Sequence, residues 1–222
     1  MNKSSLFMKI AGFIVTFLTT ITILMLSIRL LITPIFAKIE YRVPGFPEDP
    51  FGFTLEDRLL WSEPSIQYLV NTKGIRFLEE LSFVNGEPVF NERELSHMQD
   101  VKRVVTGMRF GLLSAMLLIL IFTILAIKGG WRQLLLRSFL QGAWILIGLI
   151  VAILVFVSLN FENLFSWFHQ LFFESGTWRF YTSDTLIRLF PIRFWRDAFI
   201  FVGVLSVLIS GSIILSVRKQ AF

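Results

Sequence analysis

Two histidines are the side chains of this chain best suited to acid–base chemistry. His97 comes just before one long apolar stretch, and His169 comes just after another. An imidazole changes its charge between about pH 5 and 8, so it can take up and release protons under physiological conditions. Each histidine therefore lies where a predicted membrane-spanning helix meets water, and the pair is a candidate reaction centre.

Two carboxylates flank His97 at helical spacing. Glu94 precedes it by three residues and Asp100 follows it by three, so all three share one face of a helix. Asp100 or Glu94 could orient the imidazole and hold its tautomer, as in a histidine–carboxylate pair. The alternative is that these acids are simply solvated.

Other chemistries find less support in the sequence. The chain has no cysteine, which removes thiol nucleophiles, disulfides and thiolate metal sites. Two histidines with Glu94 or Asp100 could hold zinc, but no H-E-x-x-H motif supports this. No P-loop, glycine-rich nucleotide fingerprint or G-x-S-x-G motif is present. We therefore expect neither a metal site nor ATP-driven chemistry.

Four long apolar stretches account for the composition. The 222 residues are 55% hydrophobic, with a mean hydropathy of +0.69. The stretches are residues 10–31, 105–127, 139–159 and 198–215. Because a helix needs about 20 apolar residues to cross the hydrocarbon core, we predict an all-α integral membrane protein with four transmembrane helices. Residues 1–222 then form a single membrane domain, and the first stretch is interpreted as an uncleaved anchor.

The distribution of charge predicts the orientation. The N-terminus, residues 128–137 and residues 216–222 carry basic but no acidic side chains. All 16 acidic residues lie in the two loops 36–103 and 160–197. The positive-inside rule places both termini in the cytoplasm and both loops, with the two histidines, outside the cell. The net charge of +5 needs no nucleic-acid partner.

The two loops should contain short helices at the outer membrane surface. Thr54 and Asp57 have the spacing of a capping box, and Pro64 is expected to divide the following residues into two short helices. Ser183 or Asp184 could cap another helix, which ends before Pro191. The aromatic-rich segment 161–173 is typical of a membrane interface.

A longer helix should carry His97. Asn91 is a suitable N-cap, and no proline follows until beyond the second apolar stretch. We therefore predict one continuous helix over residues 92–127, with its first three turns in water. The last apolar stretch contains Gly203, Ser206, Ser210 and Gly211, small residues that permit close helix packing.

Arg29 and Arg109 fall near the outer ends of the first two apolar stretches. A charged side chain at this depth either extends to the interface or faces a cavity. The first reading makes both arginines structural. The second lets one of them contact a lipid phosphate or an ester carbonyl.

Two segments resemble a known family. Residues 94–102 read E-x-x-H-M-x-D-V-K, and residues 168–173 read F-H-x-x-F-F; Trp178 and D-T-L-I-x-x-F-P at 184–191 follow. This pattern is similar to that of the lipoprotein intramolecular transacylase (Lit) family of Gram-positive bacteria. The similarity extends over nearly the whole chain, including the four apolar stretches and the long first loop.

The resemblance implies an enzyme of the bacterial cytoplasmic membrane that needs no cofactor. Its partners would be membrane lipid and diacylated lipoproteins, and it would move the sn-2 acyl chain to the α-amino group of the lipid-modified cysteine. The product is an N-acyl lyso-lipoprotein. His97 would deprotonate the amine and His169 would protonate the leaving oxygen, although the roles could be exchanged or a histidine could form an acyl-imidazole. Trp178 and Asp184 become candidate lipid- or ester-contacting residues.

Two other readings stay open. The chain could be a non-enzymatic membrane protein whose outer loop binds a partner during assembly. It could also be a membrane hydrolase or metalloprotease, which would release cleavage products instead of an isomer of equal mass. The sequence does not define the oligomeric state; a monomer is compatible with it.

Overall fold

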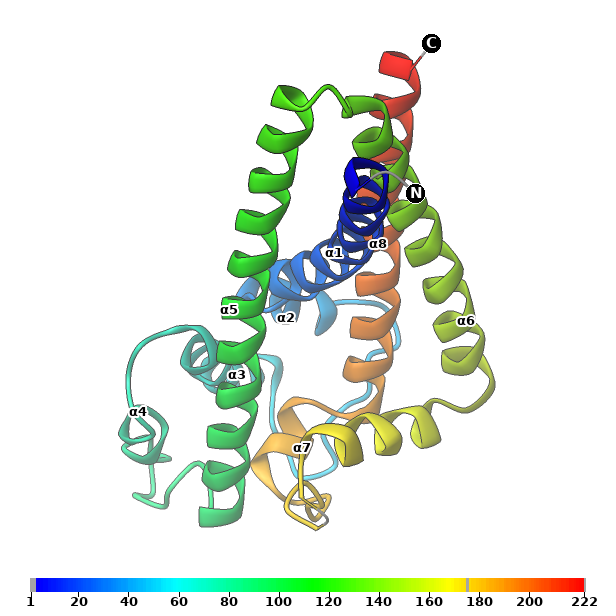
Figure 1. Ribbon diagram of the computed structural model, residues 1–222. Helices are drawn as coiled ribbons and strands as arrows, with labels where there is room; N and C mark the ends of the chain where they lie inside the picture. The colour runs from blue at the N-terminus through cyan, green and yellow to red at the C-terminus, as the bar shows by residue number, and fades with distance from the viewer. Residues whose placement is uncertain (1–2, 175, 222) are drawn as a thin grey trace. The chain divides into compact units, whose positions relative to one another are not determined.

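The described part of the chain is helical. A computed structural model describes residues 3–174 and 176–221, and these residues contain no β-strand, only an isolated bridge between Ser82 and Pro88. The predicted all-α class is confirmed. The helices, shown in Figure 1, are α1 (Lys3–Leu31), α2 (Pro34–Glu40), α3 (Leu55–Val70), α4 (Arg76–Glu79), α5 (Glu92–Lys128), α6 (Arg132–Phe172), α7 (Thr185–Leu189) and α8 (Ile192–Ala221).

Four of these helices are long and apolar enough to cross a membrane: α1, α5, α6 and α8. In their most apolar windows only 17–39% of the residues are buried inside the protein. Large apolar side chains such as Phe13, Phe110 and Leu159 face outward instead. This outward-facing surface suits hydrocarbon, in which a helix satisfies its own backbone hydrogen bonds.

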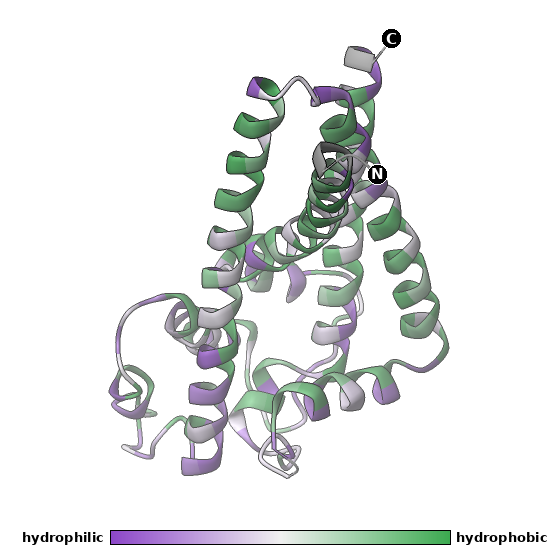
Figure 2. Ribbon diagram, viewed as in Figure 1, coloured by the Kyte–Doolittle hydropathy of each residue, from purple (hydrophilic) through white to green (hydrophobic). Residues whose placement is uncertain are grey.

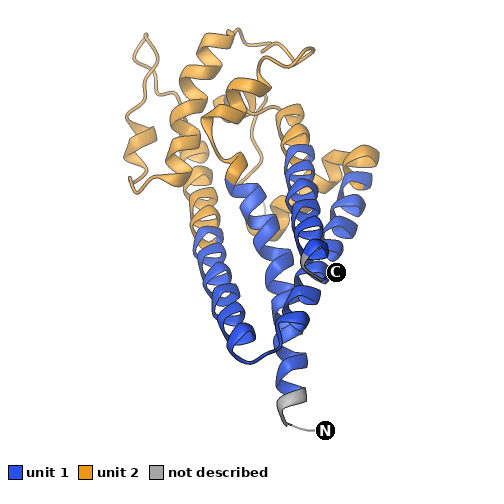
Figure 3. Ribbon diagram, turned by 90° about the horizontal axis from the view of Figure 1, so that it is seen from above, with its two compact units in different colours: residues 1–29, 108–155, 200–222 blue, residues 30–107, 156–199 orange. Residues whose placement is uncertain are grey.

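The chain forms two compact units (Figure 3). The first comprises residues 1–29, 108–155 and 200–222, and the second comprises residues 30–107 and 156–199. Both histidines and all the short helices belong to the second unit. The candidate site can therefore be described within one unit.

Small residues bring helices of the first unit close together. A Cβ atom at Gly142 of α6 would lie 2.7 Å from the Thr16 carbonyl oxygen of α1. The hydroxyl of Ser206 in α8 donates to that of Ser27 in α1 at 3.0 Å. A Cβ at Gly203 would meet side chains of α6 at 3.3 Å. The predicted close packing of the last apolar stretch is confirmed at Gly203 and Ser206.

Helix α5 is continuous from Glu92 to Lys128, as predicted. Asn91 and Glu94 form a reciprocal cap at its start: the Asn91 Oδ1 accepts the Glu94 N–H at 3.1 Å, and Glu94 Oε2 accepts the Asn91 N–H at 2.8 Å. Its 37 residues make a helix about 55 Å long, which exceeds the ~30 Å hydrocarbon core. The hydrophilic first turns (Figure 2) therefore extend beyond the apolar part.

Helix α6 has a kink at Asn160, whose backbone is extended, with φ −158° and ψ 80°. The Oδ1 of Asn160 accepts the N–H of Asn163 at 3.1 Å. Asn160 thus caps a second helical segment, because its side chain replaces a backbone acceptor that the bend removes. The first segment ends where the third apolar stretch was expected to end, and the second carries His169.

Helix α3 corrects one prediction. Pro64 lies inside a single helix from Leu55 to Val70 and does not divide it into two. The predicted capping box holds the helix start, with the Thr54 Oγ1 accepting the Asp57 N–H at 3.1 Å. Beyond Pro64, the side chains of Ile66 and Tyr68 are buried. Their burial offsets the one backbone hydrogen bond that a proline removes.

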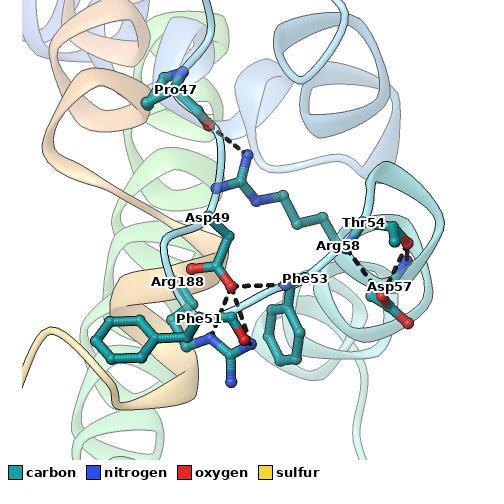
Figure 4. A network of polar contacts seen from close by, with 8 residues as sticks. All are labelled: Pro47, Asp49, Phe51, Phe53, Thr54, Asp57, Arg58 and Arg188. Carbon is teal, nitrogen blue, oxygen red and sulfur yellow. Dashed lines mark hydrogen bonds and ion pairs between the residues drawn. The ribbon is translucent and has the colours of Figure 1, made fainter.

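The second unit has its own apolar core, which includes Phe36, Leu78, Phe90, Leu186 and Leu189. A polar network ties the loop before α3 to α7 (Figure 4). Arg188 of α7 donates to Asp49 Oδ2 at 2.9 Å and lies over the Phe53 ring at 3.3 Å, and Arg58 donates to the Pro47 carbonyl at 2.7 Å. The loop is thereby held against the helix that precedes α8.

Candidate active site

The structure brings His97 and His169 together. The first lies in the polar first turns of α5, and the second lies in the capped segment of α6 after Asn160. Their ring centroids are 6.2 Å apart with an interplanar angle of 21°. Each side chain is only 8% exposed. Two residues far apart in sequence thus form one buried imidazole pair.

Aromatic rings enclose the pair. The Phe165 ring centroid lies 4.0 Å from that of His169, and the Trp178 centroid lies 4.8 Å away. Phe173 and Phe180 lie 5.0 and 5.3 Å from the His97 ring. Such a wall excludes water and strengthens any electrostatic interaction formed inside it.

The backbone defines the tautomer of His169. Its Nδ1 lies 2.8 Å from the Phe165 carbonyl oxygen, one helical turn earlier. A carbonyl oxygen can only accept a hydrogen bond, so Nδ1 carries the proton. In the neutral ring, Nε2 then has a free lone pair and can accept a proton.

Both histidines lie outside the four apolar stretches, and both are held neutral. Burial lowers the pKa of His97, a charge on His169 lowers it further, and the Asp100 carboxylate raises it. Burial also lowers the pKa of His169, while the hydrogen bond to Phe165 raises it. Because burial dominates both pKa values, the pair is uncharged near neutral pH. Neutral imidazoles can each donate one hydrogen bond and accept another.

Asp100 does not hydrogen-bond to His97. Its Oδ1 accepts from Arg103 at 2.7 Å, on the exposed side of α5. The His97 Nδ1 is buried, and it has no hydrogen-bond partner within the described part of the chain. Asp100 therefore acts on His97 through its charge, and its predicted orienting role stays a prediction.

Glu94 supports two helices. Its carboxylate is 1% exposed and accepts the Asn91 N–H at the start of α5 and, at 2.7 Å, the Leu186 N–H at the start of α7. Burial raises the Glu94 pKa, and these two N–H groups lower it. The bond to Leu186 joins residues 92 positions apart, so helical spacing around His97 gave no sign of it.

Asp184 is the residue before α7, as predicted, but its side chain does not cap that helix. Its carboxylate instead accepts from the Tyr181 N–H at 2.9 Å, from Arg93 at 3.2 Å and from the Asn91 amide at 3.2 Å. The role of cap falls to Glu94. Together Glu94 and Asp184 fasten the segment around Trp178 to the start of α5.

Comparison with known proteins identifies the family. The family model described as lipoprotein intramolecular transacylase Lit matches residues 13–195. The chain belongs to this family. An uncharacterized protein of Aquifex aeolicus (strain VF5) is 35% identical over 188 residues, which cover 82% of each chain.

Solved structures of the family share the fold. The membrane-integral lipoprotein intramolecular transacylase Lit from Bacillus cereus matches with a TM-score of 0.81 and 18% identity, covering 98% of both chains. Variants of that protein in which one histidine is replaced by arginine or by alanine match with TM-scores of 0.75 and 0.77. This chain is accordingly an integral membrane acyltransferase of the Lit family.

The remaining predicted residues of this Lit-family site fall into two groups. Trp178 lies against His169, whereas Arg29 and Arg109 belong to the first compact unit, and their contact with an ester stays a prediction. The sequence predicted only part of the aromatic wall around the two histidines. Residues 161–173 read as an interfacial belt, and nothing in the sequence marked Phe180 as a neighbour of His97.

The structure gathers no evident metal shell. Within residues 3–174 and 176–221, no group of three or more His, Asp or Glu side chains lies close enough together to hold a metal ion.

Proposed function

We propose that this chain moves the sn-2 acyl chain of a diacylglyceryl-cysteine lipoprotein to the α-amino group of that cysteine, giving an N-acyl lyso-lipoprotein. Membership of the lipoprotein intramolecular transacylase family supports the reaction class. The observation that carries the mechanism is the buried pair of imidazoles, 6.2 Å apart. Ester aminolysis needs one proton moved from nitrogen to oxygen, and this pair is suited to move it.

His169 is the better candidate for the base. The amine nitrogen attacks the ester carbonyl carbon and forms the N–C bond, and the proton it loses passes to the His169 Nε2. The tetrahedral intermediate then collapses, the bond between the carbonyl carbon and the sn-2 oxygen breaks, and His169 returns its proton to that oxygen. Only the tautomer enforced by Phe165 leaves this nitrogen free.

His97 then acts as a neutral hydrogen-bond donor to the oxygen atoms that gain charge. Its low pKa, caused by burial, keeps it uncharged, so it does not compete for the proton that His169 takes. This assignment exchanges the roles first expected from the sequence. The reason is the Phe165 carbonyl, which sequence spacing did not single out.

The surroundings favour transfer over hydrolysis. The aromatic wall excludes water, which would otherwise compete with the amine for the ester. The acyl chains can stay in hydrocarbon while the cysteine amine lies at the headgroup level. The charge distribution supports a site on the outer face of the cytoplasmic membrane.

The test is the position of the acyl chain. The protein is expressed in a host whose lipoproteins are diacylated, and lipoprotein N-terminal peptides are mapped by mass spectrometry. We expect an isomer of equal mass with an acylated amine. His169→Ala and His97→Ala should each lower its yield by about 10²-fold or more. Gln170→Ala, at the exposed neighbour of His169, serves as the control that keeps full activity.

The same experiment separates the other classes of function. A hydrolase would release free fatty acid, and a protease would release peptide fragments. A partner-binding protein would tolerate both histidine substitutions. Full lyso-form production by His169→Ala would overturn the proposal for that residue.

A further inference from the structure

Trp178 carries a buried donor that the proposed proton transfer does not use. Its indole Nε1 is buried and has no hydrogen-bond partner within the described residues. An indole N–H can only donate, and a buried polar group without a partner is unfavourable. A buried polar group of this kind in a native structure has a specific explanation, such as an ordered water, a bound ligand or a role in catalysis.

The indole ring of Trp178 lies beside the candidate base. The indole ring centroid lies 4.8 Å from that of His169, at an interplanar angle of 36°. In the other ring of the pair, the His97 Nδ1 is likewise buried, and it has no hydrogen-bond partner within the described residues. The two rings that neighbour the candidate base thus each carry a buried nitrogen without a partner, in a site otherwise lined by phenylalanine.

We propose that Trp178 is a catalytic residue whose Nε1–H donates a hydrogen bond to the carbonyl oxygen of the migrating acyl group. The inference rests on the proposed transfer and adds to it. When the amine nitrogen bonds to the carbonyl carbon, the π electrons move onto this oxygen. Trp178 stabilises the resulting oxyanion, and the electrons return when the bond to the sn-2 oxygen breaks.

Hydrogen bonds lie on both sides of Trp178 in the sequence. The Thr177 hydroxyl donates to the Glu174 carbonyl at 3.0 Å, and the Asp184 carboxylate accepts the Tyr181 N–H at 2.9 Å. These bonds shape the segment on either side of Trp178. A donor fixed in advance stabilises an oxyanion without reorganising during the reaction. An indole also stays neutral at all relevant pH values, so its contribution should not titrate.

The experiment replaces only the N–H. Site-specific incorporation of β-(3-benzothienyl)alanine at position 178 keeps the size and stacking of the ring and substitutes sulfur for the N–H group. We expect the rate of N-acylation in detergent or nanodiscs to fall about 10²- to 10³-fold. The pH dependence of the remaining activity should not change, because no titrating group is removed. Trp61→Phe, in a tryptophan of α3 that packs on Phe83, should keep full activity.

A binding measurement tests the same contact without turnover. A phosphonate analogue of the diacylglyceryl-cysteine ester mimics the tetrahedral intermediate. In ¹⁵N-tryptophan-labelled protein, the indole signal that disappears in Trp178→Phe should shift downfield when this analogue binds. The benzothienyl variant should bind the analogue more weakly than the native protein, by a larger factor than for the substrate.

Full activity of the benzothienyl variant would overturn the role of Trp178, and so would an indole signal that does not move. If that variant fails to fold, the labelled native protein decides the question alone. Failure of the proposed transfer mechanism would show in another variant. If His169→Ala remained active, that mechanism would be wrong, whatever the outcome at position 178.

Discussion

At the scale of single residues, the proposed proton transfer requires that the two imidazoles be neutral. An imidazole in water is partly protonated near pH 6.5, and a protonated ring cannot serve as a base. Burial among phenylalanine and tryptophan rings lowers the pKa of both His97 and His169. In the proposed mechanism, the pair would therefore be available as neutral imidazoles over a wider pH range than exposed histidines.

The pKa of His97 predicts a specific dependence of stability on pH. Because burial lowers this pKa in the folded protein, the unfolded chain binds the proton more readily. The contribution of neutral, buried His97 to the free energy of unfolding is therefore fully present above about pH 6.5. It is lost as the pH falls below that value, because the unfolded chain takes up the proton first. We expect the unfolding temperature in detergent to fall between about pH 6.5 and 5, and His97→Asn to reduce that fall.

The comparison of native protein with this single variant isolates His97. Buried carboxyls such as Glu94, whose pKa is raised by burial, act in the opposite direction and are common to both proteins. Identical pH dependence in the two proteins would contradict the assignment of a lowered pKa to His97. Histidine-free affinity tags are required, because the sequence contains only two histidines.

At the scale of elements, one carboxylate aligns the parts that carry the site. Glu94 accepts backbone N–H groups at the starts of both α5 and α7. Helix α5 carries His97, and the segment leading to α7 carries Trp178. A bend at Asn160 and its cap then direct the second segment of α6, with His169, to the same place. The site is therefore positioned by helix ends.

Loss of this double cap should lower stability and activity together. Glu94→Ala removes both acceptors and leaves two N–H groups without partners, and we expect a loss of about 2 kcal/mol or more in the free energy of unfolding. Glu94→Gln keeps one acceptor oxygen, so its free energy of unfolding should lie between those of Glu94→Ala and the native protein. Denaturant unfolding in detergent gives the stability, and N-acylation assays give the activity.

The matched control for Glu94 is Glu92→Ala, an exposed acid in the same turn of α5. It should change stability by less than about 0.5 kcal/mol. If Glu92→Ala and Glu94→Ala had equal effects, the cap would not be the cause.

At the scale of the whole molecule, the four apolar helices define an integral membrane protein. The distribution of charge predicts which end of each helix faces the cell exterior. Basic residues without acidic neighbours mark the predicted cytoplasmic segments, and all acidic residues lie in the two loops that carry the candidate site. The substrate lipoproteins we propose would meet the site from outside.

The absence of cysteine permits a direct test of this orientation. Val84→Cys lies in the first loop at a fully exposed position, and Lys128→Cys lies at the end of α5 in the short basic segment. A membrane-impermeant maleimide should label position 84 in intact cells and position 128 only after permeabilisation. The reverse pattern would place the candidate site on the cytoplasmic side.

The sequence alone predicts the elements well where the signal is local. Apolar stretches of membrane-spanning length, the caps at Thr54 and Asn91 and the continuous helix α5 all depend on neighbouring residues, and the structure confirms the helices and caps. The prediction that Pro64 divides the segment into two helices was wrong. Burial of Ile66 and Tyr68, which depends on contacts distant in sequence, overcomes the local preference of proline. The family, too, was recognisable from short motifs around the histidines.

Only the tertiary structure shows how the residues of the candidate site are brought together. The sequence determined that each of the two histidines lies at one end of a long apolar stretch. Their stacking depends on a bend at Asn160 and on a cap that joins Glu94 to Leu186. The tautomer of His169 and the unpartnered N–H of Trp178 follow from three-dimensional surroundings. Burial and hydrogen-bond geometry are properties of the packed chain, because residues far apart in sequence create them, and no local pattern encodes them.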